Sequence, residues 1–299
     1  MAVNNGAAAV PVMPAPPRIS QFRYFLTVYW KRPVVRFASV IIVLFVLLAI
    51  FANFIAPYPP NSQDLSNVLA GPSGAHLLGT DALGRDVLSR IIFGSRISLF
   101  IGITVVCISA VIGMGLGLLA GYFGGWVNMV IMRIIDALMA FPGILLTMLI
   151  AGSLGGGMFN LILALSIGTI PIYARLMAAM VVSTKENDYI VAERAMGASS
   201  IRIMLAHLLP NCLPPLIVII TGMLGTTILA ESGMSFLGIG ITPPTATWGS
   251  MVNDGRDYLL TNPILGIAPG IFVILVVFGF NMIGDGIRDA VDPRLRNQL

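Results

Sequence analysis

The chain has 299 residues, of which 57% are hydrophobic and only 10% are charged, and its mean hydropathy is +0.92. Soluble domains carry roughly 25% charged residues, so this composition excludes a soluble domain and indicates an integral membrane protein. The formal charge of +4 is small and dispersed along the chain, which argues against a nucleic-acid partner.

The N-terminal segment differs from the rest of the chain. Residues 1–20 are rich in Ala, Pro and Asn, carry one charge at Arg18 and contain no apolar run. We therefore expect a flexible cytoplasmic tail rather than a signal peptide. We place the end of this tail at residue 30, so that residues 31–299 form one transmembrane domain.

Six apolar runs are long enough to cross a bilayer as helices, which takes about 20 residues each. We predict an all-α fold with spans at 37–56, 97–120, 131–152, 158–178, 213–235 and 264–287. With the N-terminus inside, thirteen Lys and Arg fall on the inner side and four on the outer side. This bias places both termini in the cytoplasm. Small residues at close spacing predict tight helix packing at Gly113, Gly115, Gly117 and Gly121.

The stretch 186–211 is rich in charged residues although it lies between two apolar runs. Its apolar residues recur at i, i+3, i+4 and i+7, as on one face of a helix: Ile201, Met204, Leu205 and Leu208. Gly197 interrupts this pattern and Pro210 closes it, which predicts two short helices joined by a glycine turn. Because each charge costs several kcal/mol in lipid, we expect this stretch on the cytoplasmic membrane surface.

These residues resemble the cytoplasmic loop motif of ABC importer permeases, in which Glu-Ala-Ala is followed by Gly and later by Leu-Pro. Val191 and Glu193 depart from that motif, at its Glu and its second Ala. In the family this loop is a coupling helix that docks on an ATPase subunit, and an amphipathic surface helix without a partner is the alternative. The resemblance assigns ATPase coupling to Ala192, Glu193, Arg194, Gly197, Ala198, Ser199, Leu209 and Pro210.

Other segments extend the resemblance over nearly the whole chain from about residue 33. Residues 76–99, 132–146, 231–251 and 284–296 are similar to the C-type subunit of dipeptide, oligopeptide and nickel permeases. This implies a type I ABC importer permease fold in a bacterial inner membrane. The implied partners are a B-type permease, two ATPase subunits and an extracytoplasmic substrate-binding protein. Peptides, nickel chelates and glutathione-like cargoes all remain open as substrates.

Cofactor and catalytic chemistry are not expected on this chain. Neither Lys31 nor Lys185 follows a GxxxxGK[ST] loop, so ATP and Mg would be bound by the partner ATPases. His76 and His207 fall on opposite sides of the membrane and lack ligand spacing, so no metal site is expected. Cys107 and Cys212 have no paired spacing either.

Three acidic residues near span ends are candidate pathway or structural residues: Asp136, Glu231 and Asp285. We expect Asp136 and Asp285 to orient helices or to pair with Arg133 and Arg288. Glu231 is costly inside a span unless it is paired or faces a cavity. It is interpreted as capping a loop or meeting an Arg of a partner subunit, with substrate contact as the alternative.

The alternative function is an ion-gradient-driven secondary transporter or a channel. Such proteins place ionisable residues at mid-membrane and often contain inverted repeats. Here the charges cluster at span ends and no repeat is evident. The sequence therefore favours the importer permease, which would move substrate by alternating access.

Overall fold

The structure is a computed structural model that describes residues 21–291, so the predicted tail at 1–20 lies outside the described residues. Within 21–291 the chain is helical, and its β-structure is a single bridge between Thr80 and Asp86. Five helices are apolar and long enough to cross a membrane. They are α2 (Pro33–Ile50), α4 (Val87–Phe123), α7 (Met158–Thr184), α10 (Leu209–Phe236) and α12 (Ile264–Val291).

The third predicted span, 131–152, is wrong as a single helix. The chain forms α5 (Gly125–Met139) and α6 (Gly143–Leu154), which meet at 88°. Pro142 stands immediately before α6 with an extended ψ of 126°. Proline has no N–H to donate and disfavours helical conformation in the residue before it, so α5 ends here. Counted as one broken span, the pair gives the six predicted crossings.

The helical domain also begins earlier than expected. Residues Gln21–Lys31 form α1, so the boundary drawn at residue 30 falls inside a helix. The Tyr29 hydroxyl lies 2.8 Å from the Ser39 hydroxyl of α2. Arg32, at the junction of α1 and α2, forms an ion pair of 2.8 Å with Asp289 of α12. These contacts attach α1 to the bundle instead of leaving it as a free tail.

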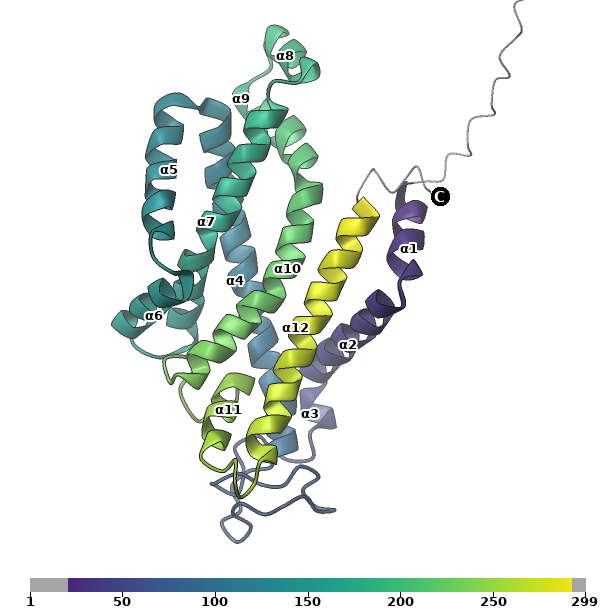
Figure 1. The fold of residues 1–299 in the computed structure, drawn as a ribbon, viewed down its shortest axis with the longest axis vertical. Coiled ribbons are helices and arrows are strands. Elements are labelled where there is room, and N and C mark those ends of the chain that lie inside the picture. The colour runs from purple at the N-terminus through teal and green to yellow at the C-terminus, as the bar shows by residue number, and fades with distance from the viewer. Residues whose placement is uncertain (1–20, 292–299) are drawn as a thin grey trace, which may run out of the picture.

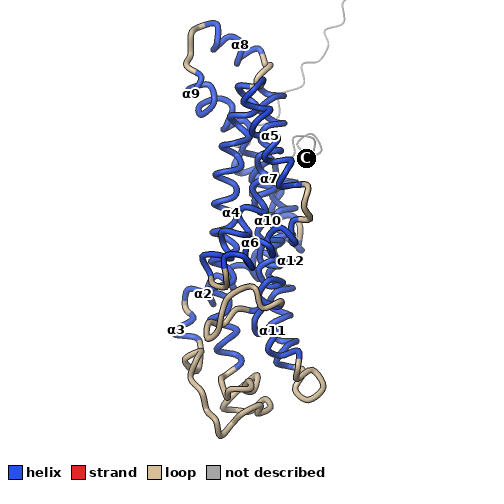
Figure 2. The backbone as a smooth tube through the Cα atoms, turned by 90° about the vertical axis from the view of Figure 1, so that its left-hand side faces the viewer, coloured by secondary structure: helices blue, strands red, loops and turns tan. Residues whose placement is uncertain are grey.

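The bundle is elongated, with short elements at its two ends (Figure 1). One end carries α8 (Asp188–Ala195), α9 (Ser200–Arg202) and the π-helix η1 (Ile203–Leu208). The other end carries α3 (Ala52–Ile55), α11 (Trp248–Arg256) and the long loop between α3 and α4, as Figure 2 shows from the side. We call these the coupling end and the outer end.

Helix α4 runs the length of the bundle and packs most closely on α7 through glycine. A Cβ on Gly113 would lie 2.7 Å from the Ile170 carbonyl oxygen, and one on Gly117 only 2.3 Å from that of Ala174. Gly121 likewise faces Val181, with 2.8 Å between its added Cβ and the valine Cβ. The predicted role in close packing is therefore confirmed for three of the four glycines. It is wrong for Gly115, which faces open space.

Gly117→Ala should destabilise the bundle by about 1–3 kcal/mol, because the methyl group would have to displace the α7 backbone. Gly115→Ala is the matched control on the same helix, two residues away, and should leave stability unchanged or slightly raised. Thermal unfolding of the detergent-solubilised protein, followed by size-exclusion chromatography, measures both. Equal midpoints for the two variants would contradict the close approach of α4 and α7.

Candidate coupling surface and outer pocket

Helix α8 is short and is anchored by one buried side chain. Asn187 precedes it, Asp188 lies in its first turn and Arg194 in its last turn, an order that suits the helix dipole. Ile190 is fully buried and belongs to an apolar cluster with Met177 and Val181 of α7. The rest of α8 is thereby held against the end of the bundle with its other sides exposed.

The predicted glycine turn between two short helices is confirmed. Gly197 has a φ of +83°, the left-handed region that L side chains rarely adopt. Its N–H donates to the Arg194 carbonyl at 3.1 Å, and the Ala198 N–H donates to the Glu193 carbonyl at 3.1 Å. These bonds satisfy carbonyls at the end of α8. Ser199 then caps the next helix by accepting from the Arg202 N–H at 3.4 Å.

Two details of this stretch differ from the prediction. Residues 203–208 are a π-helix, which places positions five apart on one face, so Ile203 and Leu208 are both fully buried. Of the predicted apolar face, Met204 and Leu208 are buried, whereas Ile201 and Leu205 are exposed. Pro210 does not close the stretch. It lies in the first turn of α10, where a missing N–H costs little, and the helix runs on.

Most of the predicted coupling residues lie together at the coupling end. Ala192, Arg194, Gly197 and Ser199 are exposed, Glu193 and Ala198 are half-buried, and Leu209 and Pro210 lie further along at the start of α10. Large exposed apolar side chains surround them: Tyr189, Val191, Met196, Ile201 and Leu205. We call these five residues the apolar coupling patch. A patch of this kind marks a contact surface for another protein or for the membrane.

Polar contacts tie the coupling patch to the bundle. The Lys185 ammonium donates to the Gly121 carbonyl at the end of α4, at 2.9 Å. The Arg194 guanidinium lies 6.0 Å from the centre of the Tyr122 ring, within reach of a cation–π contact. Glu193 and His207 approach to 3.5 Å across the glycine turn. The turn is therefore fixed relative to α4, α7 and η1 by side chains on both of its sides.

The three acidic candidates have different surroundings from those expected. Asp136 of α5 pairs with Arg175 of α7 and not with Arg133. Asp285 is exposed, and within residues 21–291 it forms no ion pair with Arg288. The carboxylate of α12 that does form an ion pair in this range is that of Asp289, which contacts Arg32. Sequence spacing favoured partners on the same helix, whereas the partner of Asp136 comes from the neighbouring α7.

Glu231 is fully buried near the outer end of α10. The Ser235 hydroxyl donates to its carboxylate at 2.9 Å, and the Ser232 hydroxyl lies 3.4 Å away. Its neighbours within the subunit are hydroxyl groups, and the expected pairing with an Arg of a partner subunit stays a prediction. Both hydroxyl groups belong to α10, so these two contacts lie within one helix.

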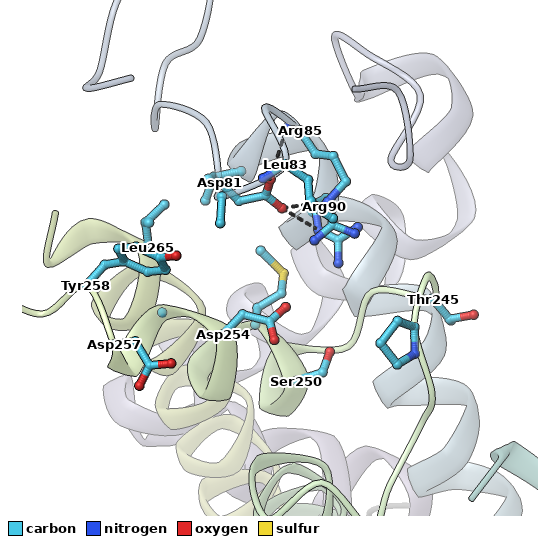
Figure 3. A pocket seen from close by; sticks show the side chains of 15 residues that line it. Asp81, Leu83, Arg85, Arg90, Thr245, Ser250, Asp254, Asp257, Tyr258 and Leu265 are labelled. Atoms are coloured by element: carbon cyan, nitrogen blue, oxygen red, sulfur yellow. Dashed lines mark hydrogen bonds and ion pairs between the residues drawn. The ribbon is translucent and has the colours of Figure 1, made fainter. Parts of the chain in front are cut away.

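A pocket of about 340 Å³, which no sequence pattern indicated, lies at the outer end between the start of α4 and helix α11. Figure 3 shows Asp81, Arg85 and Arg90 on one wall and Asp254 on the other. Asp81 forms ion pairs with Arg85 at 2.7 Å and with Arg90 at 3.6 Å. Partial burial raises the pKa of the Asp254 carboxyl, and the nearby Arg90 and Arg85 act in the opposite direction.

Arg90 is the buried centre of this outer-end network. Its side chain is 3% exposed, and one guanidinium nitrogen donates to three oxygens. These are the Pro60 carbonyl at 3.1 Å, the Asn61 side chain at 3.3 Å and the Pro244 carbonyl at 3.4 Å. Arg90 thus joins the long outer loop to the segment before α11. The run of Gly, Thr, Asp and Arg at 79–86 indicated turns and caps, but gave no sign of the distant acceptors.

Helix α4 also begins at a polar cluster of this end. Asp86 caps it by accepting from the Ser89 N–H at 2.7 Å, and its other oxygen lies 2.9 Å from His76. Trp248, at the start of α11, donates from its ring nitrogen to the Ile91 carbonyl at 3.1 Å. These contacts link α11 and the outer loop to the first turns of α4.

The chain is similar to known membrane proteins along most of its length. Residues 113–297 match the family described as binding-protein-dependent transport system inner membrane component. Residues 20–72 match the N-terminal TM domain of oligopeptide transport permease C.

Two curated relatives cover most of this chain and of their own length. The dipeptide transport system permease protein DppC of Alkalihalophilus pseudofirmus is 43% identical over 86% of this chain and 85% of the relative. The glutathione transport system permease protein GsiD of Pectobacterium atrosepticum is 39% identical over 97% of both. An inward-facing structure of the MetNI methionine ABC transporter has a TM-score of 0.53 at 22% identity, over 69% of this chain and 97% of that one, which shows a shared fold.

Replacing Arg90 with Met should destabilise the outer end by about 2 kcal/mol or more, because buried oxygens lose their donor and Asp81 loses one of its two cations. Arg256→Met is the matched control, since the Arg256–Asp257 pair is 55% and 72% exposed and should contribute less than about 1 kcal/mol. Limited proteolysis of the outer loop and thermal unfolding report both effects. An Arg90→Met protein as protected and as stable as Arg256→Met would contradict this role.

Proposed function

Because the chain belongs to the family of binding-protein-dependent transport system inner membrane components, we propose that it is one of two permease subunits of an ATP-driven importer of small peptides. Support for the substrate class comes from the relatives, named for dipeptide and glutathione transport. Glutathione is itself a short peptide with free carboxylates. The shared cargo chemistry is therefore a small peptide that carries an ammonium group and at least one carboxylate.

The apolar coupling patch carries this proposal. An ATPase subunit in the cytoplasm needs a surface on the permease that projects beyond the bilayer and accepts an apolar contact. Figure 1 shows α8 at the coupling end of the bundle, and Tyr189, Val191 and Met196, which lie on α8 or directly follow it, are exposed. Their exposure in the subunit, between 43% and 75%, leaves apolar area for a partner to bury. The predicted coupling residues Ala192, Glu193, Arg194, Gly197, Ala198 and Ser199 belong to this surface, while Leu209 and Pro210 support it from α10.

The same surface is connected to the transmembrane helices, as a transmitter must be. Ile190 packs among Met177 and Val181 of α7, and Leu208 and Leu216 belong to the same cluster on the other side. The Lys185 contact with Gly121 adds the end of α4. When ATP closes the ATPase pair, a displacement of α8 is passed through these contacts to α4, α7 and α10, and the outer side opens.

The chain itself performs no bond chemistry in this proposal. ATP and Mg are bound by two ATPase subunits, and the B-type permease completes the pathway. A substrate-binding protein delivers the peptide at the outer end. Both termini lie in the cytoplasm, on the side of the coupling patch. A secondary transporter would work without the ATPase, so co-purification of an ATPase with this chain separates the two functions.

Gly197→Val should leave membrane levels of the subunit normal but weaken ATPase binding and abolish peptide uptake. No atom lies within 4 Å of the position of its Cβ, so the effect comes from the φ of +83°, which costs a β-branched residue about 1 kcal/mol or more. Gly197→Asn is the matched control, because Asn tolerates the left-handed region and should retain both functions. Glu193→Ala and Arg194→Ala should give milder docking defects.

The measurements are ATPase co-purification with the permease pair and ATP-driven uptake of a dipeptide into proteoliposomes that contain the binding protein. Normal uptake by Gly197→Val with fully bound ATPase would show that this stretch does not couple. Loss of both functions in Gly197→Asn as well would show that the turn conformation is not what matters.

A further inference from the structure

Three charged side chains lie on exposed helix faces in the inner half of the bundle. Arg133 and Asp136 belong to α5, and Arg175 belongs to α7. At 1.5 Å per residue, Arg133 and Asp136 lie about 12 and 16 Å from Gly125, and Arg175 lies about 14 Å from Thr184. The hydrocarbon core is about 30 Å thick, whereas α7 is about 40 Å long with its 27 residues, so these side chains lie in the inner half of the bundle. The Arg175 and Asp136 side chains are nevertheless 53% and 50% exposed.

The exposed faces of three other helices are apolar at such distances from the helix ends. On α2, Val40 and Val43 are 64% and 57% exposed, and on α4 Val111 is 70% exposed. On α12, Ile274 is 67% exposed. Side chains of this kind suit contact with lipid. The contrast singles out the face shared by α5 and α7, which we call the Arg133 face after its unpaired charge.

Lipid contact is unfavourable for the Arg133 face, since one charged side chain at the bilayer centre costs about 2.5–3.5 kcal/mol or more. The pairing of Asp136 with Arg175 offsets part of that cost for two of the three charges. The Arg133 side chain has no hydrogen bond or ion pair with any residue in the described range 21–291. Its guanidinium therefore needs water or a polar ligand from outside the subunit.

The helix break next to this face leads to the same conclusion independently. Non-helical backbone at membrane depth occurs only where it is buried in protein or lines a water-filled cavity. Residues Ala140, Phe141 and Pro142 separate α5 from α6, and all three are exposed. The break lies about 21 Å from Gly125 along α5, directly beyond Asp136. Open backbone and unpaired charge thus occur on one side of the subunit.

We propose that the Arg133 face lines the aqueous route through the permease and that Arg133 binds a carboxylate of the passing peptide. The inference rests on the proposed function, because it takes peptides as the cargo. The planar guanidinium presents paired N–H donors that match a carboxylate. Asp136 holds Arg175 in a salt bridge, so Arg133 is the cation left free for the substrate. Substrate contact is brief because the site is wet and offers only one such cation.

Exposure to water is tested first, in the complete complex with ATPases and binding protein. In a chain carrying Cys107→Ser and Cys212→Ala, single cysteines are placed by Ala137→Cys on the Arg133 face and by Val40→Cys on α2. Val40 lies about 11 Å along α2 from Pro33 and Ala137 about 18 Å along α5 from Gly125, so the control position on α2 is the nearer of the two to its helix end. A membrane-impermeant charged methanethiosulfonate should label Ala137→Cys and leave Val40→Cys unlabelled. A lipid-soluble maleimide should label both, as a check that each thiol is present.

Failure to label Ala137→Cys in both the nucleotide-free and the ATP-trapped complex overturns the assignment of this face to the aqueous route. That result would instead place the face against the partner permease. Labelling in either state supports the route.

The carboxylate contact is tested by ATP-driven uptake of a dipeptide and of the same peptide with an amidated C-terminus. Arg133→Gln should lower the maximal rate for the free acid about tenfold, the equivalent of roughly 1.4 kcal/mol, and Arg133→Lys should restore part of it. The half-saturating peptide concentration should stay unchanged, because the binding protein sets it. The acid-to-amide rate ratio should also fall about tenfold. Comparing this ratio between variants cancels the selection made by the binding protein.

An acid-to-amide ratio that is the same in wild type and Arg133→Gln overturns the carboxylate contact. If the wild-type complex imports no peptide at all, the proposed function fails instead, and the labelling result still decides whether this face borders water. ATPase co-purification should be normal in every Arg133 variant, since the residue lies away from the coupling patch.

Discussion

The cost of placing charge and open backbone in lipid is the constraint on which this structure depends. Ionisable groups within the bundle reduce this cost in different ways. Arg90 is buried among oxygen acceptors, and Glu231 is buried among serine hydroxyls. Asp136 takes its counter-ion from the neighbouring α7. The charges of 186–211 avoid the problem by leaving the bilayer on α8. The apolar faces that remain on α2, α4 and α12 are those that lipid can cover.

Helix α4 connects the coupling end of the bundle to its outer end (Figure 1). Its first turns are fixed by the Asp86 cap, Arg90 and the Trp248 contact. In its last turns, the Gly121 carbonyl accepts a hydrogen bond from Lys185, and the Tyr122 ring lies near the Arg194 guanidinium. Between them, glycine brings α7 so close that the two helices cannot slide without a clash. In the proposed function, this closely packed pair of helices would carry a displacement at the coupling end toward the outer end.

The sequence was sufficient for features set by local composition and insufficient for those set by contacts between distant residues. Apolar length predicted the spans, and Gly197 predicted a left-handed turn because few other residues adopt one. The 88° break was missed because apolar composition continues across it, although Pro142 was the available signal. The π-helix, the Asp136–Arg175 pair and the three acceptors of Arg90 depend on partners up to 154 residues away, which spacing cannot reveal.

The small size of α8 shows why the coupling surface depends on its surroundings. Isolated helices shorter than about 12 residues are marginal in water, and α8 has eight residues with one fully buried side chain. Its geometry must come from the glycine turn, the Ile190 anchor and the contacts of Lys185 and Arg194. An ATPase that covers Val191 and Met196 would bury much of the apolar area that the subunit alone leaves open. Docking of the ATPase and the ordering of α8 would then occur together. The strength of coupling would depend on how much of the exposed apolar area of α8 the ATPase buries.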